Sequence, residues 1–151
     1  MSDHATVLVR AMLPEDAERV AALAGELGYP ASATDIVRRY QAIEHDPDAR
    51  LFVAQNADGA VVGWIHVQAL RFLESDARAE IEGLVVAASA RRTGVGRLLV
   101  RAAEDWTISR GLRLIGVRAN QLRTEARMFY QRIGFGVLKT QNVFRKTLPQ
   151  R

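Results

Sequence analysis

The feature of this sequence that most constrains its fold is the junction "RRTGVGRLL" (Arg91–Leu99). Before it, "IEGLVVAA" (Ile81–Ala88) is a short apolar run rich in Ile, Leu and Val, which is typical of a buried strand. After it, apolar residues recur with helical spacing from Val95 to Trp106, which predicts a helix with one buried face. The chain is therefore expected to pass from a strand to a helix through a short loop that contains two glycines.

The rest of the chain alternates between strand patterns and helix patterns, which predicts an α/β (α+β) fold with a mixed sheet. Seven strands are predicted, at Ala5–Ala11, Leu51–Gln55, Ala60–Leu70, Ala79–Val86, Leu112–Asn120, Phe135–Gln141 and Asn142–Leu148. Four helices are predicted, from Pro14 to Gly28, from Thr34 (as N-cap) to His45, from Val95 to about Gly111, and from Thr124 to Ile133. The chain of 151 residues has the length of one ordinary domain, so residues 1–151 are predicted to form a single domain.

Composition excludes several classes of protein and site. The chain has no cysteine, so disulfides, thiolate zinc sites and cysteine nucleophiles are excluded. The longest apolar run, Leu84–Ala88, is far shorter than the roughly 20 residues that a membrane span needs. Charged residues such as Asp3 and Arg10 interrupt the apolar residues of the amino terminus, so no signal peptide is expected. These observations predict a cytoplasmic protein with no membrane contact.

Charge and histidine content narrow the choice of ligand. The formal net charge of +4 fits either a mildly basic surface or a partner rich in phosphate. Aromatic residues make up only 7 % of the chain and do not alternate with basic runs, which argues against a stacking platform for nucleic acid. His4, His45 and His66 lack the spacing of metal ligands, so no metal is expected. His66 could line a pocket, although a hydrogen-bonded strand histidine is the plainer interpretation.

The junction itself has the properties of a phosphate-binding site. The first N–H groups of a helix have no partner within the helix, and the helix dipole adds partial positive charge there. Gly94 and Gly96 allow the backbone to approach a ligand, and the neighbouring arginines can donate charge-assisted hydrogen bonds to phosphate oxygens. A Walker loop would need Gly-Lys-Ser/Thr, and a Rossmann fingerprint would need glycine where Leu99 stands. The alternative is a loop whose arginines are merely solvated.

"RRTGVG" also resembles the Arg/Gln-x-x-Gly-x-Gly/Ala motif of the GCN5-related N-acetyltransferases, the GNAT superfamily. The motif stands in the order typical of that superfamily, with "LVV" (Leu84–Val86) before it and "VRAN" and "ARMFYQRIGF" after it. The resemblance extends from about Ala5 to Leu148. It implies the GNAT fold, a mixed and mostly antiparallel seven-stranded sheet with about four helices, splayed between its fourth and fifth strands. It also implies acetyl-CoA as cosubstrate.

The resemblance further implies which residues contact acetyl-CoA. They are Leu84, Val85, Val86, Arg91, Arg92, Thr93, Gly94, Val95, Gly96, Arg97, Asn120, Ala126 and Tyr130. In the superfamily the backbone of the splayed strand holds the pantetheine arm, and the amides of the junction hold the pyrophosphate. Gly83, inside the predicted strand, independently indicates a bulge or a close backbone approach.

A proton acceptor is needed because an alkylamine with a pKa near 10.4 is protonated at neutral pH and cannot attack a thioester. Glu80 and Glu82 share one face of the predicted strand by the period of two, and their mutual repulsion would raise the pKa of one carboxyl. Two solvated glutamates at a strand end are the alternative. By resemblance, Glu80 stands where histone-type acetyltransferases carry their base, and Glu82 stands where aminoglycoside 6'-N-acetyltransferases carry a glutamate. Glu82 ranks first.

Tyr130 matches the superfamily tyrosine that approaches the CoA sulfur, and a phenol with a pKa of about 10 can donate a proton to a departing thiolate. Tyr130 also lies on the apolar stripe of its helix, so a core role is the alternative and both roles can hold. Asn120 matches a position whose amide contacts the cofactor, and an asparagine that begins a loop is its alternative.

The sequence constrains the acetyl acceptor less than it constrains the acetyl donor. Glu74, Asp76, Glu80 and Glu82 favour a cationic amine, while Arg71 and Arg78 partly cancel that field. The "EGLVV" strand and the terminal "VFRK" are similar to aminoglycoside 6'-N-acetyltransferases, although Phe129 beside Tyr130 departs from many of them. A small amine or aminoglycoside-like acceptor is therefore the first expectation. A protein or peptide N-acetyltransferase and a non-catalytic acyl-CoA sensor are the alternatives, and the terminal strands could pair across a homodimer.

Overall fold

A five-stranded sheet organises the computed structural model, which describes residues 7–26 and 28–151. Its strands are β1 (Leu8–Ala11), β2 (Ala49–Gln55), β3 (Val61–Leu70), β4 (Arg78–Val86) and β5 (Ile115–Val117), and they lie side by side in that order. The first four strands pair antiparallel, and β5 pairs parallel with β4. The helices are α1 (Ala17–Glu26), α2 (Ala33–Ile43), α3 (Val95–Ser109) and α4 (Thr124–Arg132), with short 3₁₀ turns η2 (Pro14–Asp16) and η3 (Ala88–Ala90).

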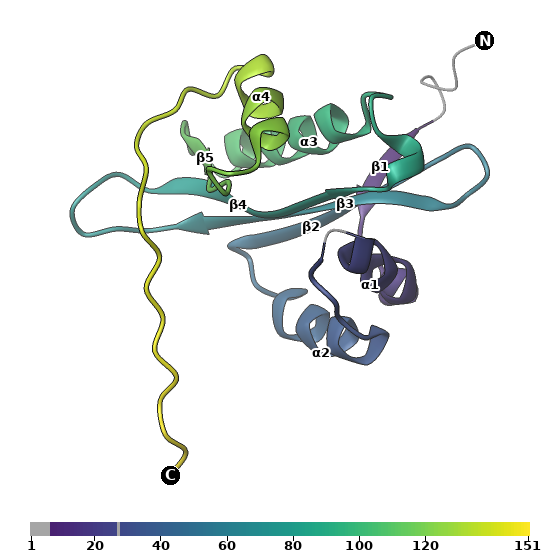
Figure 1. The fold of residues 1–151 in the computed structure, drawn as a ribbon, viewed down its shortest axis with the longest axis horizontal. Coiled ribbons are helices and arrows are strands. Elements are labelled where there is room, and N and C mark those ends of the chain that lie inside the picture. The colour runs from purple at the N-terminus through teal and green to yellow at the C-terminus, as the bar shows by residue number, and fades with distance from the viewer. Residues whose placement is uncertain (1–6, 27) are drawn as a thin grey trace. The chain divides into compact units, whose positions relative to one another are not determined.

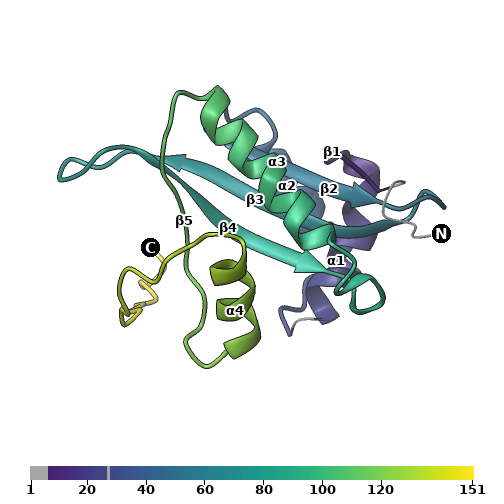
Figure 2. The same ribbon diagram turned by 90° about the horizontal axis from the view of Figure 1, so that it is seen from above.

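The chain divides into two compact units, residues 1–118 and 119–151, and each is described by itself. In the first unit, α1 and α2 lie on one face of the sheet and α3 lies on the other (Figure 1). Helix α3 packs on β2, β3 and β4 (Figure 2), and its buried side chains include Leu99, Val100 and Ala103. Leu99 and Ala103 belong to the apolar stripe that the sequence predicts, so the strand–loop–helix expectation is confirmed.

Local sequence explains how the first two helices begin. Asp16 is buried, accepts two hydrogen bonds from the Arg10 guanidinium at 2.8 and 2.9 Å, and accepts a third from the backbone N–H of Leu13. These partners, led by Arg10, hold the pKa of the Asp16 carboxyl below its usual value. Helix α2 is capped by Ser32, whose hydroxyl accepts from the N–H of Asp35 at 3.0 Å, so the prediction of Thr34 as N-cap is wrong by two residues.

The predicted mixed α/β class is confirmed, but the sheet has five strands and not seven. Residues 135–151 form no helix or strand, and β5 is three residues long where nine were predicted. An alternating apolar pattern shows only that a segment can pair; a strand also needs a neighbour with free backbone groups. Ala5 and the residue after it, the first part of the predicted first strand, lie outside the described residues, as does His4.

Candidate active site

The two edges of β4 differ beyond Ile81. Strand β5 pairs only with Ala79, Glu80 and Ile81, whereas β3 pairs along the strand as far as Val86. In the part of the first unit that the structure describes, the β5-facing edge of residues 82–86 joins no further strand. Some N–H and C=O groups on that edge are therefore available to an extended ligand, as the predicted splay between the fourth and fifth strands requires.

A β-bulge lies at the point where this opening begins. His66 pairs with Gly83 and the next residue, Val67, pairs with Ile81, so Glu82 is an extra residue on β4 with no counterpart on β3. The bulge breaks the period of two, which explains why Glu80 and Glu82 do not share a face as predicted. Glu82 is exposed, while Glu80 is only 4 % exposed.

The Glu80 carboxylate is held by Arg78 of β4 and by Arg118, the residue that follows β5. The Arg78 Nε–H donates to Glu80 Oε2 at 3.2 Å, and the Arg118 Nε lies 3.5 Å from Oε1. Gly116 makes room for this group, because a Cβ on Gly116 would lie 2.8 Å from Glu80 Oε2. Glu80 is thus a buried, ion-paired carboxylate at the last stretch where β4 and β5 still pair. The sequence did not indicate Arg118, since nothing local marks it as a partner of Glu80.

Gly83 is required by the packing of β3. A Cβ on Gly83 would lie 2.8 Å from Cζ3 and 2.9 Å from Cη2 of Trp64, so the indole ring occupies the space that a side chain would need. The expected bulge is therefore confirmed beside Gly83, whereas the group that approaches this glycine is the Trp64 side chain and not a backbone. Sequence reasoning missed Trp64, whose only signal was the glycine on the neighbouring strand.

The junction before α3 has the backbone geometry of an anion-binding loop. Arg92 has a φ of 63° and Gly94, the N-cap of α3, has a φ of 90°. No side chain caps the helix, and Gly94 O accepts from the N–H of Leu98, so the amides of residues 95–97 have no acceptor within the helix. The hydroxyl of Thr93 donates to the carbonyl of Ala90, which ties the loop back to η3.

The predicted contact residues of this region differ in exposure. Arg91, Arg92, Gly94 and Arg97 are exposed, Leu84, Val86, Thr93 and Gly96 are half-buried, and Val85 and Val95 are buried. A Cβ on Gly94 would meet nothing within 4 Å, so the space before the helix is open. Outward amides, exposed arginines and open space together can hold an anion such as a phosphate.

The second unit contains the remaining predicted contact residues. Tyr130, on α4, lies edge-to-face against Phe129 and Phe135, with ring centroids 5.1 and 5.4 Å away. Burial raises the pKa of the Tyr130 phenol to about 12. Asn120 is exposed, and its Oδ1 accepts from the N–H of Leu122 at 2.9 Å, which is the loop-initiating role given above as its alternative. Ala126 is half-buried on α4.

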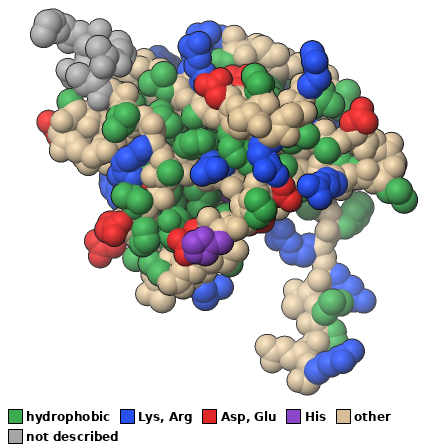
Figure 3. All heavy atoms as spheres, turned by 180° about the vertical axis from the view of Figure 1, so that it is seen from behind, with side chains coloured by type: hydrophobic (Ala, Val, Ile, Leu, Met, Phe, Trp, Pro, Cys, Tyr) green, Lys and Arg blue, Asp and Glu red, His purple; other side chains and the backbone are tan. Residues whose placement is uncertain are grey.

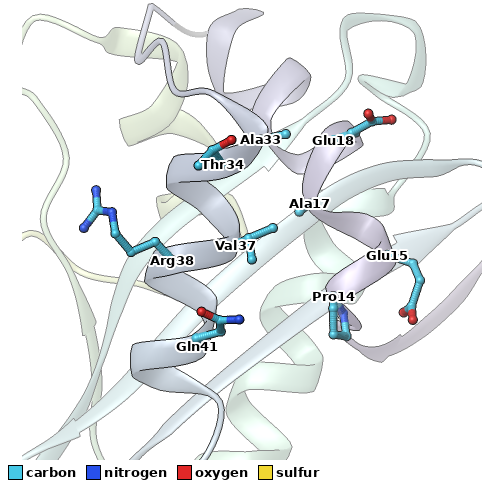
Figure 4. Close-up of a pocket in the computed structure, with 9 residues that line it drawn as sticks. All are labelled: Pro14, Glu15, Ala17, Glu18, Ala33, Thr34, Val37, Arg38 and Gln41. Carbon is cyan, nitrogen blue, oxygen red and sulfur yellow. The ribbon is translucent and has the colours of Figure 1, made fainter.

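A cavity of about 540 Å³ lies between α1 and α2 and contains none of the predicted site residues. Figure 4 shows Val37 and Ala17 facing one another across it, while the ends of Glu15, Glu18 and Arg38 point away. Its apolar floor and outward charges offer no reactive group to a substrate. Among the residues described, no cluster of three metal-ligating side chains occurs, and no helix has the length and apolar character to span a membrane.

Comparison with known proteins identifies the family. A sequence model of the acetyltransferase (GNAT) family matches residues 16–135, and the chain belongs to this family. The streptothricin acetyltransferase of Streptomyces lavendulae is 34 % identical over 90 residues, which are 60 % of this chain and 46 % of that protein. The chain thus aligns with less than half the length of this curated relative.

Solved structures share the fold. A transcriptional regulator from Bacillus halodurans C-125 has a TM-score of 0.83 and 25 % identity, over 93 % of this chain and 99 % of that one. The aminoglycoside N-acetyltransferase AAC(6')-Iy, solved with CoA, has a TM-score of 0.82 and 21 % identity, over 93 % of this chain and 94 % of that one. The predicted superfamily and its fold are therefore confirmed, with the correction to the strand count given above.

Proposed function

We propose that this chain is an acetyl-CoA-dependent N-acetyltransferase whose acceptor is a small cationic, aminoglycoside-like amine, and that residues 1–151 act as one domain. The observation that carries the proposal is the junction of residues 91–97, where an uncapped helix start, two positive φ angles and exposed arginines occur together. The family match runs through both compact units, which supports a single functional domain.

The structure offers acetyl-CoA two complementary binding features. The outward amides of residues 92–97, with Arg91, Arg92 and Arg97, would hold the pyrophosphate. The open edge of Leu84–Val86 would pair with the amide groups of the pantetheine arm, as one strand pairs with another. When bound, acetyl-CoA supplies an acetyl group activated as a thioester. A bare anion site would need only the first of these features, so the open strand edge favours a long ligand.

Glu82 is assigned the role of proton acceptor. Its exposed carboxylate is the extra residue of the bulge, beside the open edge of β4, and it can take the proton from an incoming ammonium directly or through water. Glu80 is less suited to this role because it is buried and both of its carboxylate oxygens already face arginines.

Tyr130 is assigned the role of proton donor. With a pKa raised to about 12 by burial, its phenol remains protonated across the physiological range and can donate a hydrogen bond to the departing thiolate. Asn120 and Ala126 are proposed to contact the cosubstrate with it, because the family motif places them there.

The acceptor class rests on charge and on the relatives. Glu74 and Asp76 are exposed on the connection between β3 and β4, and Glu82 is exposed on β4; these carboxylates favour a cation, although the exposed Arg71 offsets part of their charge. The names of the relatives above, streptothricin acetyltransferase and aminoglycoside N-acetyltransferase, point to the same class of acceptor.

A homodimer is proposed from the carboxyl-terminal segment. Residues 135–151 expose Val137, Leu138, Val143, Phe144 and Leu148 by 63–90 %. Figure 3 shows apolar and basic side chains alternating along this segment. An uncovered apolar series of this length is typical of a surface that packs against a partner, and a second copy of the chain is the occupant proposed here.

Calorimetric titration with acetyl-CoA and CoA-thiol release with streptothricin, neamine, spermidine and a lysine peptide test the function. We expect turnover on the first two amines, and a rise of about tenfold in the Kd of acetyl-CoA for Arg97→Gln, since 1.4 kcal/mol is one charge-assisted hydrogen bond. Arg101→Gln is the matched control, because Arg101 is also exposed on α3 but lies beyond the helix start.

Turnover on the peptide alone would favour the protein acetyltransferase. Tight acetyl-CoA binding without turnover on any amine would favour the sensor. Absence of acetyl-CoA binding would contradict the proposal as a whole.

A further inference from the structure

Trp64, on β3, covers the point where the open edge of β4 begins. Trp64 pairs with Val85, and its ring extends diagonally to Gly83, where a Cβ would lie 2.8 Å from Cζ3 and 2.9 Å from Cη2 of the indole. Both atoms belong to the six-membered ring, on the edge of the indole away from its nitrogen. This apolar edge therefore lies over Gly83, beside the bulge at Glu82.

The position uses the size of the indole and not its N–H group. Among the described residues, Trp64 Nε1 and His66 Nε2 are the only buried side-chain nitrogen or oxygen atoms without a hydrogen-bond partner. The interpretation of His66 as a hydrogen-bonded strand histidine is therefore wrong for this nitrogen. A buried donor without a partner is costly, and an apolar ring would avoid that cost. What tryptophan adds at this position is the volume of its ring over Gly83.

The proposed path of acetyl-CoA brings its thioester to the same point. The pyrophosphate would lie at residues 91–97, which follow β4, and the pantetheine arm would run back along the open edge of Leu84–Val86. The sulfur end of the arm then lies beside Glu82 and Gly83, where the open edge starts. The acyl group is therefore the part of the cosubstrate that lies next to the Trp64 ring.

An acyl chain at this point has little room beyond acetyl. Along the edge, the residue before the bulge is Ile81, and Val117 of β5 already pairs with it. Helix α3 covers one face of the sheet, where a Cβ on Gly63 would lie 3.0 Å from Leu99 Cδ1. Trp64 is the next residue along β3 and so faces the other side. The paired strand, α3 and the indole thus close the directions in which a longer chain could extend.

We propose that the Trp64 ring limits the acyl group of the cosubstrate to acetyl, so that the enzyme discriminates against propionyl-CoA, butyryl-CoA and longer acyl-CoA molecules. This inference rests on the proposed function and adds the residue that selects its acyl donor. Gly83 contributes because a side chain there would push the ring from its position. The ring acts by excluded volume: the acetyl methyl fits beside it, and each further methylene overlaps the indole.

Trp64→Leu tests the inference because it removes most of the ring and keeps an apolar side chain. Calorimetric titration without an acceptor gives the Kd values of acetyl-CoA, propionyl-CoA and butyryl-CoA, so the test needs no turnover. We expect the wild-type chain to bind butyryl-CoA at least about tenfold more weakly than acetyl-CoA. In Trp64→Leu the ratio of these two Kd values should fall about tenfold, since the two added methylenes then find apolar space.

Two further variants complete the design. Trp64→Phe removes less volume and should improve the binding of propionyl-CoA more than that of butyryl-CoA, which keeps the test available if Trp64→Leu does not fold. Trp106→Leu is the matched control, because it removes the same atoms from a tryptophan that is buried in α3. It should lower the melting temperature and leave the ratio of the Kd values unchanged.

The outcomes separate this inference from the proposed function. Unchanged Kd ratios in both Trp64 variants overturn the inference and leave the acetyltransferase proposal intact. A wild-type chain that binds butyryl-CoA as tightly as acetyl-CoA overturns it as well, and so does a Trp106→Leu control that shifts the ratio equally. Absence of acetyl-CoA binding by the wild-type chain overturns the proposed function itself.

Discussion

The two halves of β4 differ in how completely their polar groups are paired. Residues 79–81 pair with strands on both sides, and the one buried carboxylate among them, Glu80, is held by Arg78 and Arg118. Residues 83–86 pair with β3 only, and Glu82, just before them, is an exposed carboxylate on a bulge. One strand thus has a half that stabilises the fold and a half that leaves groups available for a ligand. The same residue type thus has different surroundings in the two halves, since only Glu80 is buried beside compensating charges.

The largest expected effect comes from a substitution in the half of β4 whose edge is open, residues 82–86. Glu82→Gln removes the proposed proton acceptor and should lower kcat/KM by about 100-fold or more, the usual contribution of a general base. Stability should change little, because the side chain is exposed. Steady-state kinetics with streptothricin measures the effect, and Asp105→Asn, an exposed carboxylate on α3, is the control. Full activity in Glu82→Gln would show that another group accepts the proton.

In the paired half of β4, residues 79–81, a substitution should change stability more than activity. Glu80→Gln removes the counter-charge of two partly exposed arginines, which water can then solvate, and should lower the free energy of unfolding by about 2 kcal/mol through the weakened hydrogen bonds at this buried site. At temperatures below the unfolding transition of the variant, its kcat should remain within tenfold of the wild-type value. Urea unfolding and kinetics on the same samples measure both quantities. A pH–rate profile that loses its low-pH limb in Glu80→Gln, but not in Glu82→Gln, would exchange the two roles.

Local sequence predicted some features of this site and missed others for a physical reason. The loop of residues 91–97 is specified by its own glycines and by the helix that follows, so it could be predicted. The roles of Glu80 and Glu82 depend on a bulge and on Arg118, which is distant along the chain, and a period of two contains neither. The two carboxyl-terminal strands were wrongly predicted for the same reason, since an alternating pattern does not specify which strand it would pair with.

Gly116→Ala strains the paired half without changing a charge. Its Cβ would lie 2.8 Å from Glu80 Oε2, so the carboxylate must move away from its arginines, at a cost of about 2 kcal/mol. In Glu80→Ala the obstructing group is gone, and the same glycine substitution should cost much less. The double-mutant cycle measured by urea unfolding should therefore show strong coupling. Additive losses would mean that Gly116 is needed for its backbone and not for space.

The smallest effect distinguishes the two arginines of the paired half. Arg118 is 68 % exposed at the side chain and lies 3.5 Å from Glu80, so Arg118→Gln should cost less than about 1 kcal/mol, as for most exposed ion pairs. Arg78 is more buried, donates at 3.2 Å and lies 4.1 Å above the ring of Phe72, so Arg78→Gln should cost about 2 kcal/mol. Urea unfolding at low and at high salt measures both, and only the Arg118 contribution should disappear in high salt. Equal losses that persist in salt would show that Arg118 is held as firmly as Arg78, and the paired half would then extend one residue beyond the end of β5.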